Sequence, residues 1–359
     1  MKILHCAETI KGGVATVLKQ IAAAQISSPD CKRLICLVPD SQRDELLEIA
    51  DENIITFKRK GRDLGSFISL IKTFTRQLLK DKPDVVHLHS TFSGVLARLV
   101  LIVIYPFHRP KVVYCPHAFS FIMESSLLKK KCYVWIERFF SLITDKIICV
   151  SDYERNQAVR YGLNEKKLVV IHNGVPQRDN ARRLNNDSKI DLLFVGRLDF
   201  QKGYDLLISA MKKINDPTIH LTIVGDSVNG ETEKIALDNI TYTGWIKSNE
   251  LEKYFLKSDA LVIPSRWEGF AMVPLEAMSY SLPVIASDST SLPEVVHNND
   301  SGFLFKSGDA NDLKNKILDL KNVDLTLMGE KGNKLFSKAF TSKSMIEKTA
   351  LLYQQIGLR

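Results

Sequence analysis

The stretch PSRWEGFAMVPLEAM, residues Pro264–Met278, decides how the rest of the chain is interpreted. It follows a short apolar run, Ala260–Pro264, that favours a strand. A helix is predicted to begin near Val273–Pro274, because proline fits the first turn of a helix. The free N–H groups at a helix start bind anions. We therefore expect this strand, small-residue loop and helix to hold a phosphate.

Two carboxylates flank the predicted turn: Glu268 lies in the loop and Glu276 inside the helix, with seven residues between them. Ionised carboxylates accept hydrogen bonds from hydroxyls and repel an anion. Next to a phosphate site they indicate a ligand that carries sugars as well. The spacing alone would also fit solvent-facing charges on an amphipathic helix.

A second informative stretch is IDLLFVGRLDFQKGYDLLISAM, residues Ile190–Met211. Its strand is predicted to end at Gly196, followed by Arg197 and, five positions later, by Lys202. Two cations at a strand-to-helix turn can clamp a diphosphate, arginine through its planar fork and lysine as a point charge. An ordinary surface pair is the alternative.

The two stretches, read as P-S-x-x-E-G-F-x-x-V-P-L-E-A-M and G-R-x-x-x-x-K-G, resemble the retaining family-4 glycosyltransferases of GT-B fold. The resemblance extends over essentially the whole chain. It implies an α/β protein with two Rossmann-like β/α/β domains that face each other across a cleft. It also implies a nucleoside-diphosphate sugar as donor, with no cofactor and no metal.

The resemblance assigns catalytic roles to four residues: His117, Arg197, Lys202 and Glu268. It assigns donor binding to three of these, Arg197, Lys202 and Glu268, and to Gly12, Gly13, Gly196, Trp245, Ile246, Gly269, Phe270, Ala271, Met272, Val273 and Glu276. Arg197, Lys202 and the helix N–H groups of Met272–Leu275 would stabilise the leaving diphosphate. Glu276 would accept hydrogen bonds from the ribose, whereas Glu268 and His117 would contact the transferred sugar.

The nucleotide base is expected near Trp245, Ile246 and Lys247, held mostly by backbone groups. A buried tryptophan that serves only the core is the alternative for Trp245.

In the N-terminal half, β-rich apolar runs alternate with longer mixed segments, which is typical of βαβ units and a parallel sheet. The runs are Lys2–Cys6, Leu34–Val38, Val85–His89, Lys111–Cys115 and Lys146–Val150. Gly12 and Gly13 separate a strand from a helix and permit close approach of a phosphate, although a simple sharp turn needs the same residues.

His117 follows the fourth of these runs, at the strand edge where open α/β sheets bind ligands. A hydrogen-bonded structural imidazole is the alternative for His117. We expect His87 and His89 to be interior residues. Ser151 ends the next run, and its role stays open.

The pattern divides the chain at VVIHNGVP, after which Gln177–Lys189 is polar and aperiodic. We predict an acceptor-binding domain over 1–176, a linker over 177–189 and a donor-binding domain over 190–340. The resemblance implies that a C-terminal helix, about 341–359, packs back on the first domain.

Charge is uneven: residues 1–180 carry a net charge of +9 and the remainder −1. Two segments mix cations with apolar or aromatic residues, 58–62 with Lys58, Arg59, Lys60 and Arg62, and 127–135 with Lys129–Lys131. Such mixtures suit an anionic membrane surface, although a solvated basic loop is the alternative. No run approaches the roughly 20 apolar residues that span a bilayer.

MKILHCAET reads as a first strand and not as an export signal, so we expect a cytoplasmic protein, peripheral on the inner face of the plasma membrane at most. The six scattered cysteines are then reduced thiols.

These inferences predict a retaining hexosyltransferase that moves a sugar, most commonly from a UDP-sugar in this family, to a glycan or undecaprenyl-linked acceptor for O-antigen, capsule or other surface polysaccharide.

Three alternatives stay open. Another GT-B enzyme, such as a sugar-nucleotide epimerase or a phosphorylase, would share the donor site. A dehydrogenase fits less well, because Gly12-Gly13 lacks the G-x-G-x-x-G pattern. A nucleic-acid-binding protein would use the basic half, but no recognition module is visible and no nucleic acid is expected.

Overall fold

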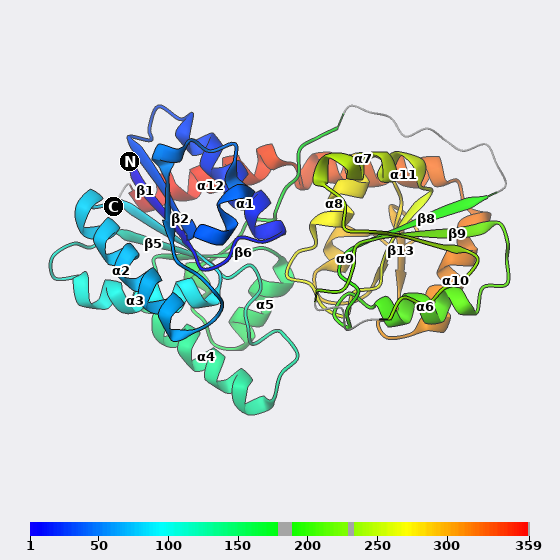
Figure 1. Ribbon diagram of the computed structural model, residues 1–359, viewed down its shortest axis with the longest axis horizontal. Helices are drawn as coiled ribbons and strands as arrows, with labels where there is room; N and C mark the ends of the chain where they lie inside the picture. The colour runs from blue at the N-terminus through cyan, green and yellow to red at the C-terminus, as the bar shows by residue number, and fades with distance from the viewer. Residues whose placement is uncertain (179–188, 229–232, 358–359) are drawn as a thin grey trace. The chain divides into compact units, whose positions relative to one another are not determined.

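The computed structural model describes residues 1–178, 189–228 and 233–357. Contacts divide the chain into two compact units, residues 1–173 with 342–359, and residues 174–341 (Figure 1). The predicted linker, 177–189, falls mostly on residues 179–188, which lie outside the described part. The expected cleft between the domains concerns their relative placement and stays a prediction.

The first unit is built on a parallel sheet with the strand order β3-β2-β1-β4-β5-β6-β7 among the described residues. Its strands are β1 (Lys2–Ala7), β2 (Arg33–Pro39), β3 (Ile54–Phe57), β4 (Val85–His89), β5 (Lys111–Cys115), β6 (Lys146–Cys149) and β7 (Leu168–Val170). Most of these strands are buried along nearly their whole length, as expected for a parallel sheet covered on both faces. The sequence pattern had not indicated β3, a short and mostly half-exposed edge strand.

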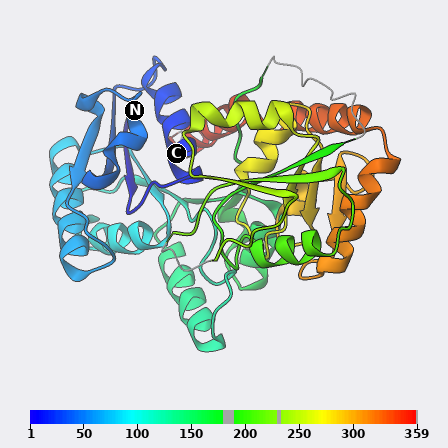
Figure 2. The same ribbon diagram turned by 45° about the vertical axis from the view of Figure 1, so that its right-hand side comes forward.

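Helices cover both faces of this sheet. They are α1 (Gly13–Ile26), α2 (Leu64–Asp81), α3 (Thr91–Ile104), α4 (Leu127–Ser141), α5 (Asp152–Arg160) and α12 (Ser342–Gly357). α1 packs against α12, and α2 packs against α3, which also contacts α4. Figures 1 and 2 show α4 extending away from the sheet.

The second unit repeats the architecture, with the parallel strand order β10-β9-β8-β11-β12-β13 among the described residues. The strands are β8 (Ile190–Val195), β9 (Ile219–Val224), β10 (Ile240–Gly244), β11 (Ala260–Ile263), β12 (Val284–Ser287) and β13 (Gly302–Phe305). The helices are α6 (Tyr204–Lys212), α7 (Ser248–Lys257), α8 (Met272–Ser279), α9 (Leu292–Val295), α10 (Ala310–Asp319) and α11 (Leu325–Ala339). Two parallel sheets flanked by helices confirm the predicted α/β class.

A buried ion pair ties α3, α4 and β5 together in the first unit. Arg98 is fully buried, and its Nη2 lies 3.0 Å from Glu137 Oε2. The Tyr114 hydroxyl donates to the other carboxylate oxygen at 2.8 Å, and the guanidinium lies over the Tyr114 ring. Because each charge is the other's partner, removing one alone would leave the other buried and unpaired.

Four of the cysteines, Cys6, Cys36, Cys115 and Cys149, lie buried and unbridged on strands. Burial raises the pKa of the Cys36 thiol to about 12, so it stays protonated. Among the helices of the described residues, none combines the length and apolar composition needed to cross a bilayer.

Candidate functional site

The candidate site of the second unit lies where its strand order reverses. β8 and β11 are neighbours in the sheet but are separated by two strands in sequence. Ligands of open α/β sheets bind at such switch points, outside the carboxyl ends of the strands. The loops that leave these two ends, 196–203 and 264–271, contain seven of the fourteen predicted donor residues.

Lys202 and Glu268 meet at this edge. The Lys202 Nζ lies 2.6 Å from Glu268 Oε1, and the Ser265 hydroxyl donates to the same oxygen at 2.7 Å. Only 9% of Glu268 is exposed, so its charge is held by partners and not by water. A surface location for this carboxylate is therefore ruled out.

Arg197 lies beside the same loops. Its Nη2 is 2.9 Å from Gln201 Oε1 and 3.2 Å from Asp199 Oδ2. Gln201 in turn donates to the Trp267 carbonyl at 3.2 Å, which connects the loop after β8 to the loop after β11. With 42% of its side chain exposed, Arg197 can still turn toward an anionic ligand.

Two further contacts fix the distance between the loops, and the sequence patterns had not indicated either. Arg266 makes a two-pronged ion pair with Asp205, with both N–O distances at 2.7 Å, and stacks over the Phe200 ring. Gly203 immediately precedes α6 with a φ of +70°, and a Cβ there would lie 2.0 Å from the Pro264 carbonyl oxygen. Glycine is required here because the two loops touch.

The α8 helix begins at Met272, one residue before the predicted start. Ala271 precedes it without a side-chain cap, so the first N–H groups of the helix are available to an anion. Met272 and Val273 are half-buried, as is Gly269 in the preceding loop. Phe270 is buried and packs against Phe340, which leaves only its backbone to contact a donor.

Glu276 lies in the second turn of α8. Within the described residues, no hydrogen bond or ion pair reaches its carboxylate. Burial raises the pKa of Glu276, and the positive charge of Arg178 partly opposes that shift. A carboxylate of this kind would gain from the hydroxyl donors of a bound sugar or ribose.

Trp245 and Ile246 directly follow β10, the edge strand of the sheet. Trp245 is 60% exposed, which contradicts the alternative that it serves only the core. Ile246 is half-buried and Lys247 is exposed. Their assignment to the nucleotide base stays a prediction.

Gly12, Gly13 and His117 belong to the first unit, at the carboxyl edge of its sheet. Gly12 precedes α1 with a φ of +66°, and a Cβ there would meet open space. The turn is therefore accessible from outside.

His117 also has a positive φ, 57°, and is the partly exposed end of a cluster of imidazoles. Its Nε2 lies 3.0 Å from Nδ1 of His89, which is buried, as is His87. Both strand histidines are interior, as expected. Burial lowers the pKa of His117 to about 4, so the ring is neutral at pH 7.

Glu8 is a buried carboxylate that the sequence analysis missed. It follows β1, is 1% exposed, and accepts from Arg59 Nε at 2.9 Å and Nη2 at 2.7 Å. Arg59 is therefore paired with Glu8. Of the cations in the basic segment 58–62, Lys58, Lys60 and Arg62 are the exposed ones. Because partners 51 residues apart are not visible in a local pattern, the sequence does not predict that Arg59 pairs with Glu8.

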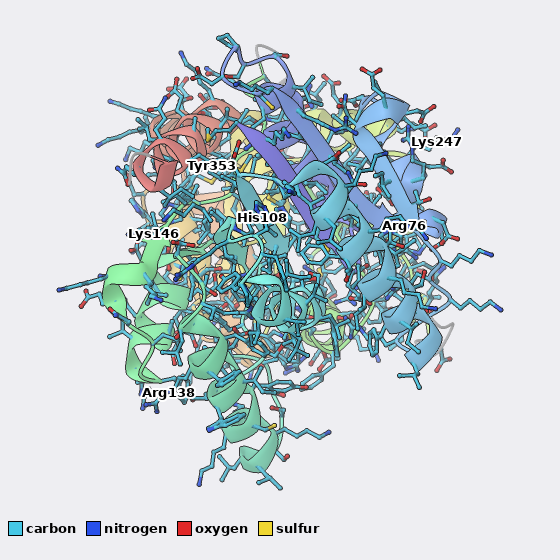
Figure 3. All side chains as sticks on the ribbon, turned by 90° about the vertical axis from the view of Figure 1, so that its left-hand side faces the viewer. Arg76, His108, Arg138, Lys146, Lys247 and Tyr353 are labelled. Carbon is cyan, nitrogen blue, oxygen red and sulfur yellow. The ribbon has the colours of Figure 1, made fainter. Side chains whose placement is uncertain are left out.

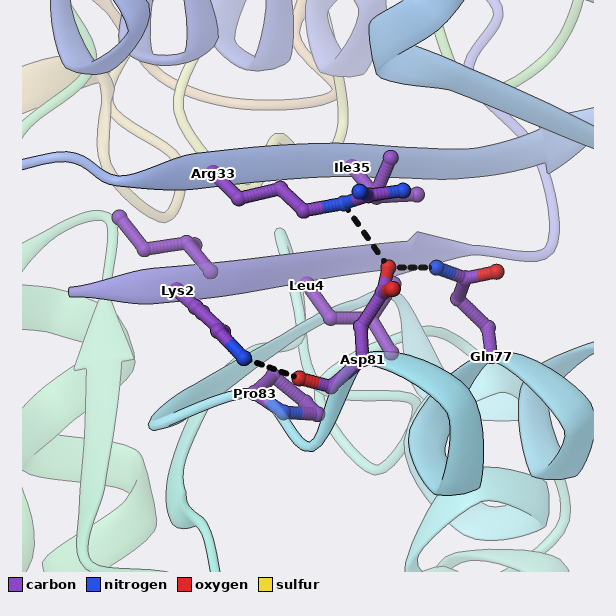
Figure 4. Close-up of a pocket in the computed structure, with 8 residues that line it drawn as sticks. Lys2, Leu4, Arg33, Ile35, Gln77, Asp81 and Pro83 are labelled. Atoms are coloured by element: carbon purple, nitrogen blue, oxygen red, sulfur yellow. Dashed lines mark hydrogen bonds and ion pairs between the residues drawn. The ribbon is translucent and has the colours of Figure 1, made fainter.

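A small pocket lies at the opposite, amino-terminal ends of β1 and β2 (Figure 4). Asp81 closes it, with its backbone carbonyl 3.0 Å from the Lys2 ammonium and its carboxylate 3.1 Å from Arg33 Nε. Parallel sheets bind ligands at the other edge, so these polar groups serve structure.

Two family models cover the chain in sequence. One described as "Glycosyltransferase Family 4" matches residues 11–178, and one described as "Glycosyl transferases group 1" matches residues 177–340. The chain is 40% identical over 322 residues to an uncharacterized 41.2 kDa protein in the cps region of Klebsiella pneumoniae, with 87% of each chain covered. It is 30% identical to the UDP-Gal:alpha-D-GlcNAc-diphosphoundecaprenol alpha-1,3-galactosyltransferase of Escherichia coli, over 72% of this chain and 70% of that one.

Solved structures agree on the fold. HepE of Anabaena in complex with UDP superposes with a TM-score of 0.78 at 16% identity, covering 99% of this chain and 100% of that one. The lipopolysaccharide outer core galactosyltransferase WaaB gives a TM-score of 0.75 at 20% identity, with 99% and 100% covered. These neighbours confirm the predicted GT-B architecture. With two family models spanning both units and relatives matched over most of their length, the chain belongs to the glycosyltransferases, family 4 in its first half and group 1 in its second.

Proposed function

We propose that the protein is a retaining glycosyltransferase that transfers a sugar from a UDP-sugar to a lipid-linked saccharide during synthesis of a surface polysaccharide. One observation carries the proposal. Arg197, Lys202, Glu268 and the uncapped start of α8 gather from separate segments at the switch point of the second sheet. Cations, an anion-binding helix start and a buried carboxylate together suit a sugar attached to a diphosphate.

The reaction would break the bond between the anomeric carbon and the diphosphate and form one between that carbon and the acceptor's hydroxyl oxygen, whose proton would pass to the leaving phosphate. Negative charge develops on the leaving group as the first bond breaks. Arg197, Lys202 and the first N–H groups of α8 would stabilise that charge in place. Glu276 would hold the ribose, and Glu268 would accept hydrogen bonds from the transferred sugar. Positive charge from side chains then suffices without a metal, and retention would follow from attack on the same face as the departing phosphate.

The relatives support the pathway. The Escherichia coli relative named above uses an undecaprenol-linked acceptor by its name, another is named as the O-antigen biosynthesis glycosyltransferase WbnH, and HepE was crystallised with UDP. UDP and a diphosphoundecaprenol-linked sugar are therefore the first donor nucleotide and acceptor to test.

We also propose that α4 brings the protein to an anionic membrane. Leu127, Leu128 and Trp135 are 80%, 79% and 69% exposed, and Lys129 and Lys131 are exposed beside them. Apolar side chains bordered by cations suit the interface of an anionic bilayer.

The donor is tested by thermal shift and calorimetry with UDP, GDP, ADP and TDP and their sugars. We expect a rise in Tm with one nucleotide and its sugars. Incubating the matching sugar nucleotide with a diphosphoundecaprenol-linked acceptor should then release nucleoside diphosphate, and NMR of the product should show the anomeric configuration of the donor. Stabilisation by no nucleotide, or epimerisation of free donor without transfer, would contradict the proposal.

A further inference from the structure

Buried imidazoles form a continuous chain of hydrogen bonds beneath His117. His117 Nε2 lies 3.0 Å from His89 Nδ1, and His89 Nε2 lies 3.0 Å from His5 Nδ1. The chain ends at Gln25 on α1, whose Oε1 lies 2.7 Å from His5 Nε2. His5 and His89 are both fully buried, so water cannot replace these contacts.

The strand register explains why the rings meet. His5 on β1 is paired with His87 on β4, and Ala7 with His89. Residues two apart on a strand share a face, so His5, His87 and His89 all lie on the same side of the sheet. That side faces α1 and α12, where the Tyr353 hydroxyl lies 2.7 Å from His87 Nδ1. Figure 3 labels Tyr353 on α12.

The amide of Gln25 sets the direction of every bond in the chain. Its carbonyl oxygen can only accept, so His5 carries its hydrogen on Nε2 and leaves Nδ1 as an acceptor. His89 must then donate from Nε2, and its own Nδ1 accepts from Nε2 of His117. A neutral imidazole carries a single hydrogen, which leaves a lone pair on Nδ1 of His117.

All rings are neutral at pH 7, as this chain requires. Burial lowers the pKa of His5 and of His117 to about 4, and it lowers the pKa of His89 in the same direction. No member of the chain therefore carries the second hydrogen that would break the sequence of donors and acceptors.

We propose that Gln25, His5 and His89 are positioning residues that hold His117 in the Nε2–H tautomer, so that its Nδ1 accepts a hydrogen bond from a hydroxyl of the donor sugar. The role for the sugar rests on the proposed function, whereas the tautomer is a property of the protein alone. In this tautomer His117 accepts a hydrogen bond from the sugar and does not donate one. It therefore requires a sugar hydroxyl whose hydrogen is not already engaged in another hydrogen bond.

The tautomer is measured directly. Long-range ¹H–¹⁵N correlation spectra of protein labelled at its eight histidines, assigned through His→Gln variants, distinguish Nδ1 from Nε2 protonation. We expect His5, His89 and His117 of the unmodified protein to carry hydrogen on Nε2 at pH 7. Hydrogen on Nδ1 of His117 would overturn the inference, and because no substrate is present, this result does not depend on the proposed function.

Variants of Gln25 test the cause. Gln25→Glu keeps an acceptor at this position and should preserve the Nε2–H tautomer of His117. Gln25→Leu removes the acceptor and should give a mixture of tautomers at His117, with kcat lowered about tenfold, as for one lost neutral hydrogen bond. Gln20→Leu, on the same helix but outside the chain of histidines, is the control and should change neither.

An unchanged tautomer in folded Gln25→Leu would remove Gln25 from the inference. Equal loss of activity in Gln25→Glu and Gln25→Leu would do the same, because a purely structural role does not distinguish an acceptor from an apolar side chain.

Discussion

The ammonium of Lys202 and the carboxylate of Glu268 lie 2.6 Å apart although 66 residues separate them in sequence. The family resemblance assigns Lys202 to the diphosphate of the donor and Glu268 to its sugar. In the structure the two charges neutralise each other. A bound diphosphate would compete for Lys202, so donor binding should loosen this pair and free Glu268 to accept hydrogen bonds from sugar hydroxyls.

Removing either cation should slow transfer. Lys202→Ala and Arg197→Ala are each expected to lower kcat by about 10²–10³, the loss typical of one group that stabilises developing charge. Steady-state release of nucleoside diphosphate measures the effect. Lys212→Ala, an exposed position at the end of α6, is the matched control. Near-normal turnover in the Lys202 and Arg197 variants would exclude both from the mechanism.

The carboxylate of Glu276 should lower the stability of the folded protein at pH 7 and strengthen its binding of the donor. Its pKa is raised in the folded state, so the folded protein holds the proton more tightly and stability falls as pH rises through the window between the unfolded and folded pKa values. Glu276→Gln should therefore raise Tm at pH 7. Calorimetry should show donor binding weakened about tenfold or more, as for a lost hydrogen bond to a charged acceptor. Unchanged nucleotide affinity would contradict a contact with the ribose.

The buried histidines should make the protein sensitive to mild acid. His5 has a folded pKa of about 4 against 6.5 when unfolded, so the unfolded chain binds more protons between these values. Stability is then fully present above about pH 6.5 and declines as pH falls toward 4, by about 3 kcal/mol from His5 alone. Urea unfolding at several pH values measures the decline. A His5→Gln variant should show a shallower slope, and a slope equal to that of the unmodified protein would contradict the assignment.

Breaking the buried ion pair of the first unit should destabilise it strongly. Arg98→Met leaves the carboxylate of Glu137 buried without its cation and is expected to cost about 3–5 kcal/mol. The double variant Arg98→Met/Glu137→Met should recover much of that loss, because no unpaired charge remains. Denaturant unfolding of the single and double variants gives the comparison. A double variant no more stable than the single one would show that packing, and not charge, causes the loss.

Membrane association should depend on the cations of α4. Sedimentation with vesicles that contain anionic lipid is expected to carry the protein down at low salt and less of it at high salt. Replacing Lys129, Lys130 and Lys131 by glutamine should weaken this binding, whereas the same change at Lys212 and Lys213 should not. Salt-independent sedimentation, or none, would contradict the proposal.

Much of the fold could be predicted from local patterns, because buried parallel strands read as short apolar runs and loops with Gly-Gly, G-R or P-S mark their ends. Elements with weak periodicity, such as β3, could not be predicted in this way. In the site, the motifs and their spacing predicted that Arg197, Lys202 and Glu268 take part in donor binding. The residues that hold them, among them Asp205 and Arg266, act across long sequence separations that no local pattern reports.

Only part of the chain of histidines could be predicted from the sequence. The sequence predicts that His87 and His89 are interior residues, which the structure confirms. Their pairing with His5 depends on which strand lies next to β4, and their link to Gln25 depends on how α1 crosses the sheet. Neither is set by spacing along the chain.

The helix α12 completes the first unit, although residues 342–357 are translated after the whole of the second. Tyr353 and its neighbours cover the histidine face of the first sheet, so a nascent chain must keep that face uncovered until the ribosome has made both units. The first unit therefore cannot be completed before the second has been synthesised, and removing α12 by early termination should leave an aggregation-prone first unit rather than a shortened enzyme.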